Sequence, residues 1–558
     1  MSHRERMSHV DTAWLRMDRP VNLMQIVGVM VFDGKLDFAR LRRVVAHRLL
    51  RYRRFRQIAV VEDNGAWWVD DPAFSLDAHL RRSLLPAPAG KAELQQFVSE
   101  LIANPLNPAR PRWEFNLVEL ADGNSAMVVR IHHAIADGIA LVGVITSLTD
   151  ADAAAEDAAD DEEIAGLTLA ASADDDWHEN DVFWRHLYEP INEATLASIR
   201  IGSSLWSKYF EMLLSPTRAF DYARIVASFT QEIAKLALMP NDTPTRFKGR
   251  PGTAKCVAWS EPIPLPEMKA VSKVLGCSIN DLLLSSAAGA LCRYLAEHGE
   301  LAPDTEIRAL VPVNLRPPGD IGELGNRFGL VALEHSLGIE NPLARLYVTR
   351  QRMEALKESY QAALTFSILG VVGMVPKFLQ QKVLDLLANK ATAVMTNVPG
   401  PQQARYLAGS RIAQQMFWVP QSGDIGMGLS ILSYDGKVQL GLITDQGMVP
   451  DPEKIVERFA VEFEKLLWLV LMEPWERLDQ PQAVEEALQA AASESQRRSS
   501  ATEESAATAA RPAAVAATKK PKARARPAGK ADDAKDAALP VAKETGAPAR
   551  ARRRRPAV

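Results

Sequence analysis

The pattern of apolar and polar residues over the first 150 positions predicts strands and a helix. Residues 24–32 are rich in β-branched residues and are followed by Asp33-Gly34, which predicts a strand and then a turn. From residue 38 to 51, apolar positions recur about every 3.6 residues and predict an amphipathic helix. Residues 125–132 predict a second strand, which ends at two histidines. A strand, a helix and a strand in this order favour an α/β domain, which we place at 7–150.

The same patterns return further along and predict a second α/β domain over residues 246–480. Its predicted elements are a helix at 278–298, a strand at 307–313, a helix at 345–360 and a hairpin at 428–444 that turns at Asp435-Gly436. Residues 151–245, between the two domains, begin with Ala, Asp and Glu and continue with helical spacing. We interpret them as an acidic linker and a helical crossover.

Composition and charge agree with two cores and a tail. At about 100–200 residues per domain, 558 residues allow two or three domains, and 47% apolar with 24% charged residues is typical of globular proteins. Residues 488–558 consist largely of Ala, Pro, Lys and Arg, which cannot bury enough apolar area to order the chain. Residues 501–558 contain fourteen Lys or Arg against six Asp or Glu, so this segment has a charge of about +8, although the whole chain has a net charge of -4. We therefore expect a disordered basic tail.

Cysteine usage and hydropathy limit the compartment. Three cysteines without paired spacing predict neither a disulfide framework nor a structural zinc site. The N-terminus is charged where a signal peptide is apolar, and no segment reaches the ~18–20 uninterrupted apolar residues of a spanning helix. We expect a cytoplasmic protein whose contact with the inner face of a membrane or with lipid inclusions is peripheral. The apolar stretch 363–387 offers such a contact, although core packing explains it equally well.

The basic tail has two open interpretations. Its charge alone suffices to bind anionic lipid, storage granules or nucleic acid, and it ends in Arg552-Arg553-Arg554-Arg555. A plain solvated tail explains the same composition. We expect no nucleic-acid partner for the rest of the chain.

The two histidines that end the second predicted strand are the main candidates for chemistry. Adjacent strand residues face opposite sides, so only one of His132 and His133 can enter a given cleft. A neutral imidazole accepts a hydroxyl proton near pH 7, and such transfer contributes ~10²–10⁴-fold in rate. Asp137 can cap a helix or pair with an arginine, and Gly138 allows tight backbone passage. His133, His132 and Asp137 are therefore our candidate catalytic residues, with Gly138 in support.

Two other interpretations of this segment stay open. Two histidines can simply end a buried strand, with Asp137 as a helix N-cap. A metal site of two histidines and one carboxylate is the second alternative, but neighbours that face opposite sides give it poor geometry. We predict no metal.

The residues His132-His133-Ala134-Ile135-Ala136-Asp137-Gly138 have the form HHxxxDG, and with them the chain resembles a known family. It is similar to the bacterial wax ester synthase/diacylglycerol acyltransferases, which belong to the coenzyme A-dependent acyltransferase superfamily with chloramphenicol acetyltransferase and peptide-synthetase condensation domains. The other matching segments are Val10-Asp11-Thr12-Ala13-Trp14, Asn22-Leu23-Met24-Gln25, Arg110-Pro111-Arg112-Trp113-Glu114, Ser278-Ile279-Asn280-Asp281, Val311-Pro312-Val313-Asn314, Gly325-Asn326-Arg327, Thr396-Asn397-Val398-Pro399-Gly400-Pro401 and Ser433-Tyr434-Asp435-Gly436. Together these segments span roughly residues 7–475.

The resemblance implies two chloramphenicol-acetyltransferase-like α/β domains with an active-site tunnel between them. His133 would be the general base, Asp137 an anchor for its loop, and Asn280 and Asp281 second-domain groups near the tunnel. A helix cap and a first-turn carboxylate explain Asn280 and Asp281 equally well. The chain departs from the family at Arg112, where the family usually has leucine, so an acyl or acceptor contact of this position does not carry over from the resemblance.

The resemblance implies an O-acyltransferase that moves a fatty acyl group from acyl-CoA to diacylglycerol or a long-chain alcohol, with no bound cofactor. The sequence has no Gly-x-Ser-x-Gly elbow and no cysteine with a histidine close by, which favours direct transfer over an acyl-enzyme. A lipid- or granule-binding protein on the same fold without turnover is the alternative from another class. A condensation-type or other alcohol acyltransferase is the alternative within enzymes.

Overall fold

The computed structural model describes residues 4–62, 65–153, 240–315, 324–357 and 388–472, with the single positions 365, 366, 368 and 380. The predicted linker and crossover, the apolar stretch 363–387 and the basic tail lie wholly or almost wholly outside the described residues. The chain divides into two units, Met1–Ala491 and Ala492–Val558, and the fold below is that of the first unit.

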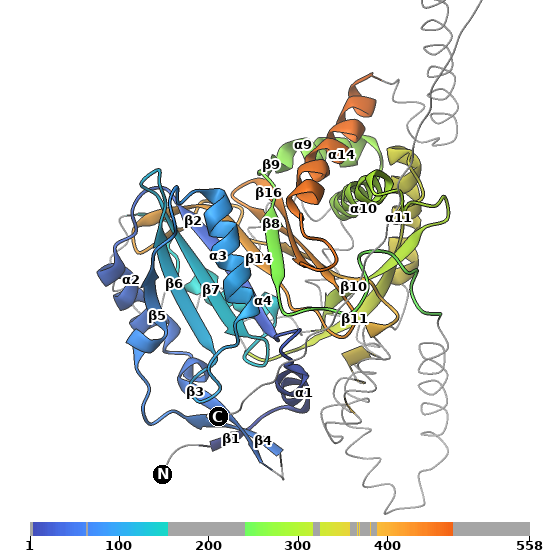
Figure 1. The fold of residues 1–558 in the computed structure, drawn as a ribbon. Helices are drawn as coiled ribbons and strands as arrows, with labels where there is room; N and C mark the ends of the chain where they lie inside the picture. Colours follow the sequence, from blue (N-terminus) through green and yellow to red (C-terminus); the bar gives the residue numbers. More distant parts are fainter. Residues whose placement is uncertain are drawn as a thin grey trace, which may run out of the picture. The chain divides into compact units, whose positions relative to one another are not determined.

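Six strands form the first sheet, in the order β13-β14-β2-β7-β6-β5 (Figure 1). They are β13 (Tyr406–Leu407), β14 (Ser410–Trp418), β2 (Gln25–Phe32), β7 (Ser125–His132), β6 (Trp113–Glu119) and β5 (Leu80–Ser83). β2 and β7 are antiparallel neighbours, with Gln25 opposite His132 and Phe32 opposite Ser125. Almost all their residues are buried on both faces, as expected where both faces of a sheet are covered. The strands predicted at 24–32 and 125–132 are confirmed.

Alternation along β2 divides the core of this half into two layers. Val27 and Val29 share one apolar cluster with α3 (Lys91–Ala103). Ile26 and Met30, one position out of phase, share another with α4 (Gly138–Ser147). The other α-helices described in this half are α1 (His9–Met17) and α2 (Phe38–Val44), which continues as a π-helical turn over Val45–Leu49, and short 3-10 helices cover Arg53–Arg56 and Leu76–Ala78. A small separate sheet has the order β1-β4-β3, with β1 (Arg4–Arg6), β4 (Gly65–Asp70) and β3 (Gln57–Glu62).

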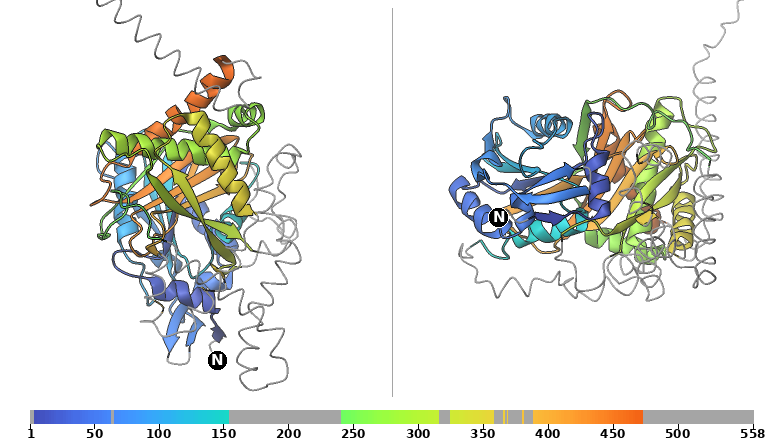
Figure 2. Two further views of the ribbon diagram at one scale, coloured as in Figure 1. Left: turned by 90° about the vertical axis from the view of Figure 1, so that its right-hand side faces the viewer. Right: turned by 90° about the horizontal axis from the view of Figure 1, so that it is seen from below.

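The second sheet has the strand order β11-β10-β12-β15-β16-β8, and β9 pairs with β16 beside it. Its strands are β11 (Phe328–Ser336), β10 (Glu306–Asn314), β12 (Ala393–Pro399), β15 (Met427–Tyr434), β16 (Lys437–Asp445), β8 (Lys255–Trp259) and β9 (Ile263–Pro264). Four helices pack against it: α9 (Leu265–Val274), α10 (Ile279–Glu297), α11 (Pro342–Lys357) and α14 (Glu453–Met472). They gather on one face of this sheet (Figure 2). The predicted hairpin at 428–444 is confirmed as β15 and β16.

The helix α10 is the centre of the second core. Nearly all of its residues are buried, and its neighbour α14 contributes Glu462, which forms a buried ion pair with Arg345 of α11. Gly289 of α10 lies directly against this pair, since a Cβ there would stand 2.3 Å from Glu462 Oε2. Close approach between α10 and the ion pair therefore requires glycine at this position.

Two strands from the second half of the sequence belong to the first sheet. β14 pairs antiparallel with β2, from Ile412 opposite Phe32 to Trp418 opposite Val27, and β13 extends that edge. β14 also contacts β15 of the second sheet. The sequence analysis placed all of 246–480 in a second domain and did not anticipate this crossover.

Within the described residues, no single helix is both long and apolar enough to cross a bilayer. Only α9 and α10 taken together pass such a test by length and composition, and they are bent by 100° at the break between them.

Candidate active site

The side chains of His132 and His133, at the end of β7, lie on opposite faces of the first sheet. His132 is the last residue of β7, and its backbone N–H donates to the Arg112 carbonyl on the neighbouring chain segment. The next N–H, that of His133, donates to the Met24 carbonyl on the other side, at 2.7 Å. Both histidines are buried, at 2% and 4% exposure. The His132 ring contacts Asp18 and the His133 ring contacts Trp14 and Asn326, so each ring has its own surroundings, as the sequence predicts.

His133 is held in one tautomer by Asn326, which comes from the segment before β11. The Asn326 Nδ2 lies 2.8 Å from the His133 carbonyl oxygen, which can only accept, so this end of the amide is the donor. Its Oδ1 must then accept from His133 Nδ1–H, at 2.8 Å. The Asn326 Nδ2 also donates to Asp11 Oδ1 of α1, at 2.7 Å. With the proton on Nδ1, the lone pair of the neutral ring is on Nε2.

Aromatic rings surround His133 and keep water from it. Trp14 of α1 stacks on the imidazole with centroids 4.1 Å apart and planes 14° apart, and Phe328 of β11 lies at 5.7 Å. This burial lowers the pKa of His133 to about 4, against the opposing effect of the negative charge on Asp137. The ring is therefore neutral at pH 7, and it can accept a proton at Nε2.

His132 has both ring nitrogens engaged. Its Nδ1 accepts from the Ala134 N–H at 3.0 Å, so its Nε2 carries the proton and donates to Asp18 Oδ2 at 3.3 Å. Arg112 donates to the same oxygen at 3.1 Å, and the Met24 N–H donates to the other at 2.7 Å. The arginine that departs from the family pattern is thus the ion-pair partner of Asp18. No lone pair of His132 is left for a substrate proton.

Asp137 joins the histidine loop to the segment that supplies Asn326. It is the N-cap of α4, where its Oδ1 accepts from the Ala140 N–H at 3.0 Å, and its Oδ2 accepts from the Arg327 N–H at 3.0 Å. A short parallel bridge between Ala136 and Gly325 lies beside these bonds. The carboxylate therefore fixes loop geometry and supplies negative charge near His133. Asp137 does not form a metal site with the two histidines, whose rings face apart, and the described residues contain no such group elsewhere.

Gly138 begins α4 next to open space. A Cβ built there would meet no atom within 4 Å, and its backbone is not in the left-handed region. Packing at this position therefore does not require glycine, contrary to the tight passage that the sequence suggested.

Asn280 and Asp281 lie at the N-terminus of α10. Ser278 caps this helix, and its backbone N–H donates to Asp281 Oδ2 at 3.0 Å, which completes a capping box. The Asn280 Oδ1 accepts from Asn397 of β12 at 2.9 Å, while its buried Nδ2 has no hydrogen-bond partner. Among the described residues, no hydrogen bond joins Asn280 to His133. Helix capping accounts for Asp281, and the side-chain amide of Asn280 has an N–H donor without a partner.

Asp11, Trp14 and Asn326 lie within the family segments but are not among the predicted site residues. One local signal was available for the first of them. Asp11 lies among Val10, Ala13 and Trp14 on a helix whose apolar side is buried, and a carboxylate at such a position needs a specific partner. The partner itself is 315 positions away in sequence.

An apolar pocket lies on the His133 side of the first sheet. It opens between β2, β7, β14 and α4, next to the β15 residue Leu432 and to Gly400. Ile131 of β7 lines it, and this residue faces the same side as His133, two positions further on.

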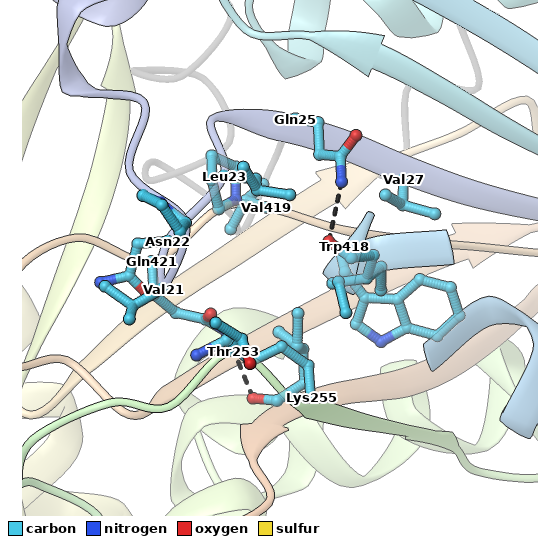
Figure 3. Close-up of a pocket in the computed structure, with 15 residues that line it drawn as sticks. Val21, Asn22, Leu23, Gln25, Val27, Thr253, Lys255, Trp418, Val419 and Gln421 are labelled. Atoms are coloured by element: carbon cyan, nitrogen blue, oxygen red, sulfur yellow. Dashed lines mark hydrogen bonds between the residues drawn. The ribbon is translucent and has the colours of Figure 1, made fainter. Parts of the chain in front are cut away.

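A second, smaller pocket lies on the His132 side (Figure 3). Gln25 lines it and donates to the Ile102 carbonyl at 2.8 Å, the upper dashed line in the view. Lys255 lies across from Gln25 and is paired with Asp445 at 2.9 Å. Residues from both halves of the chain therefore line this pocket, and Asp445 neutralises the charge of Lys255.

Comparison with known proteins identifies the family. Residues 7–283 match the wax ester synthase/diacylglycerol acyltransferase catalytic domain, and residues 324–467 match the WS/DGAT C-terminal domain. A Mycobacterium tuberculosis (strain ATCC 25618 / H37Rv) protein named "Probable diacyglycerol O-acyltransferase tgs1" is 26% identical over 448 residues, which cover 78% of this chain and 89% of that protein.

Solved structures agree on the fold. The wax ester synthase/diacylglycerol acyltransferase from Marinobacter aquaeolei VT8 superposes with a TM-score of 0.59 at 18% identity, over 84% of this chain and all of that one. The first condensation domain of the calcium-dependent antibiotic synthetase, solved with a substrate analogue, superposes with a TM-score of 0.51 at 14% identity, over 86% of this chain and 97% of that one. The predicted fold class of two chloramphenicol-acetyltransferase-like α/β domains is confirmed. The chain belongs to the wax ester synthase/diacylglycerol acyltransferase family, as its HHxxxDG segment and second-half blocks predict, and it is an acyltransferase.

Proposed function

We propose that this protein transfers a fatty acyl group from acyl-CoA to the hydroxyl of diacylglycerol or of a long-chain alcohol, with His133 as the general base. The observation that carries the proposal is the fixed tautomer of His133. Asn326 holds the proton on Nδ1, so Nε2 of a buried neutral ring is the proton acceptor. The named activity of the mycobacterial relative supports diacylglycerol as one acceptor.

The chemistry balances without a covalent enzyme intermediate. His133 Nε2 removes the hydroxyl proton, the hydroxyl oxygen bonds to the thioester carbon, and the carbon–sulfur bond breaks as the tetrahedral intermediate collapses. The imidazolium then returns its proton to the departing thiolate, which releases free coenzyme A. Burial raises the pKa of the Cys256 and Cys292 thiols, which makes them poor nucleophiles and supports direct transfer.

Two carboxylates favour the imidazolium that forms in this step. Asp137 acts through its charge, which opposes the effect of burial on the pKa of His133. Asp11 acts through Asn326, because it accepts from the amide whose other end accepts from Nδ1–H. The pKa of His133 is about 4 in the free site. The two carboxylates stabilise the positive charge that develops on its ring, so they make His133 a better proton acceptor during the reaction.

In this scheme His132 and Asp137 position the base rather than transfer protons. His132 receives the Ala134 N–H and donates to Asp18, which orders the loop directly after β7. Asn280 is a second-domain group with a free buried donor, and its contact with a substrate stays a prediction.

The test is release of free coenzyme A from palmitoyl-CoA by the purified protein, with diacylglycerol and hexadecanol in parallel. We expect His133→Ala to lose ~10²-fold or more of the acceptor-dependent rate. His335→Ala is the matched control, because His335 is equally buried but lies on β11 in the second half and has no hydrogen-bond partner. Full activity of the His133 variant, or covalent acyl-protein after incubation with palmitoyl-CoA alone, would refute the mechanism.

Peripheral contact with a membrane or lipid inclusion, inside the cytoplasm, is a further proposal that rests on the lipid acceptors. Recovery of the protein only in the soluble fraction of lipid-loaded cells would count against it.

A further inference from the structure

We propose that the π face of Trp14 stabilises the imidazolium that forms on His133 during acyl transfer, so that Trp14 has a role in the reaction besides packing. The inference rests on the proposed function, because it concerns the charged state of the same base. His133 becomes charged when its Nε2 takes the proton of the acceptor hydroxyl, and it stays charged until that proton passes to the departing thiolate. Trp14 exchanges no proton with the substrate and acts through His133.

The indole of Trp14 lies where a cation–π contact requires it. The rings of Trp14 and His133 are stacked, with centroids 4.1 Å apart and planes 14° apart, so the imidazole covers the face of the indole rather than its edge. A cation within about 6 Å of the centre of an aromatic face is attracted by the negative charge of that face, and tryptophan attracts it most strongly. The attraction is greatest where water is excluded. Both residues are buried, so the site meets this condition.

The helix α1 supplies two groups that favour positive charge on His133. Asp11 and Trp14 are three residues apart, so their side chains leave the same side of the helix. Asp11 acts in the plane of the imidazole, through the hydrogen bonds of the Asn326 amide. Trp14 acts on the face of the imidazole. The two contributions are therefore separate, and a change in the indole leaves the hydrogen bond that fixes the tautomer in place.

Hydrogen bonds of α1 hold the indole over the imidazole. Ser8 caps the helix and accepts from the Asp11 N–H at 3.0 Å, and Gln380 donates to the Ala13 carbonyl at 2.9 Å. The Nε1 of Trp14 is buried and has no hydrogen-bond partner among the described residues. The hydrogen bonds of the described residues therefore give no reason for an indole at this position. The electron density of its face, which is higher than that of phenylalanine, gives one.

A second stacked pair of histidine and tryptophan lies near the β5 edge of the first sheet and serves as a comparison. The rings of His79 and Trp113 have centroids 4.6 Å apart and planes 16° apart, and both residues are buried. The His79 Nδ1 donates to the Trp113 carbonyl at 2.7 Å, because a carbonyl oxygen can only accept. His79 receives no proton in the proposed mechanism. The electron density of the Trp113 face should therefore not affect the rate.

Fluorinated tryptophans test the electron density of the indole face at nearly constant shape. Each fluorine withdraws charge from the ring, so the attraction for a cation falls from tryptophan through its mono-, di- and tetrafluorinated forms. The measured quantity is the single-turnover rate of coenzyme A release from palmitoyl-CoA with hexadecanol. We expect this rate to fall at each step, by up to about 30-fold over the series, which corresponds to the loss of a cation–π contact away from water. KM for palmitoyl-CoA should change much less, because Trp14 acts through the base.

The controls separate Trp14 from the other tryptophans. The chain has eleven tryptophans, and biosynthetic labelling replaces all of them. In labelled Trp14→Phe, which keeps a ring at this position, the rate should be the same at every step of the series. Trp113→Phe, which removes the second indole stack, should keep the full fluorine dependence. A rate that does not fall with fluorine in the wild type would overturn the proposal, as would an equal fall in Trp14→Phe. A rise would also overturn it, since fluorine makes the indole N–H a better donor to a substrate oxygen.

A second measurement does not depend on turnover or on the folding of Trp14→Phe. The pKa of His133 is followed by NMR of isotope-labelled histidine, with its resonance assigned from the His133→Gln variant. A weaker attraction makes the imidazolium less stable, so the pKa of His133 should fall below its value of about 4 with each fluorine. A pKa that is constant through the series, or that rises because water enters, would overturn the contact. If the wild type releases no coenzyme A, the proposed function fails, whereas a falling pKa still supports the contact.

Discussion

Replacing Asn326 with alanine tests whether one hydrogen bond sets the protonation of the base. The change removes the acceptor of His133 Nδ1–H and leaves that donor buried, because Trp14 stacks on the ring and excludes water. A buried polar group without its partner costs about 1–3 kcal/mol. In the variant, this cost favours the other tautomer, which carries its proton on Nε2 and cannot accept one there.

The magnitude for kcat follows from that cost. Each ~1.36 kcal/mol is a factor of ten in rate, so the Asn326→Ala variant should lose about 5- to 160-fold in kcat. KM for acyl-CoA should change much less, since Asn326 contacts the base and not the pocket. The assay is coenzyme A release at saturating acceptor, with thermal unfolding measured on the same preparation.

Asn116→Ala is the matched control for the loss of a buried amide. Asn116 lies on β6, and its amide bonds to Glu114 and Ser83 rather than to the histidine loop. Both variants should melt at lower temperature than the wild type, but only the Asn326 variant should lose kcat. An intact fold with wild-type kcat at position 326 would refute the tautomer argument.

Three further predictions follow from burial and packing. Since burial lowers the pKa of His133 to about 4, kcat/KM should be flat from pH 8 to 6 and fall only as pH approaches that value; a fall centred near pH 6.5 would contradict the burial. Burial also lowers the pKa of His335 to about 4, so the folded state binds fewer protons than the unfolded state. This contribution to stability is present above pH 6.5 and is lost as pH falls towards 4, by about 2 kcal/mol at pH 5. His335→Leu should therefore reduce the drop in urea midpoint between pH 7 and 5, and an identical drop would contradict it. Gly289→Ala should destabilise the protein by about 3–5 kcal/mol in urea unfolding, because its Cβ would displace the buried Glu462–Arg345 pair; a wild-type midpoint would show that the helices can separate at little cost.

Local patterns were enough to predict the elements that carry the two histidines. Runs rich in β-branched residues placed β2 and β7 within a residue of their observed bounds, and the alternation of strand residues predicted that His132 and His133 face apart. The predicted helix at 38–51 was only partly correct. It is α-helical to Val44 and π-helical to Leu49, a difference of hydrogen-bond register that a hydrophobic period does not encode.

Contacts between distant segments could not be predicted this way. Asn326 is 193 positions from His133, and no local period relates two such residues. The same limit hid the pairing of β14 with β2, since nothing in residues 410–418 specifies the strand with which they pair. The ion pair that Arg112 forms with Asp18 was hidden for the same reason.

Because β14 pairs with β2, the first sheet cannot be completed until residues 410–418 have been synthesised. Until residue 418 has left the ribosome, β2 has β7 on one side and an open edge of apolar residues on the other. Open edges of this kind recruit other strands, and a nascent chain exposes this one while several hundred residues are still to come. A fragment that stops at the boundary suggested by the two family matches would keep His133 but lack the strand beside its pocket. The half of the protein that carries His133 is therefore built from two segments that are far apart in the sequence.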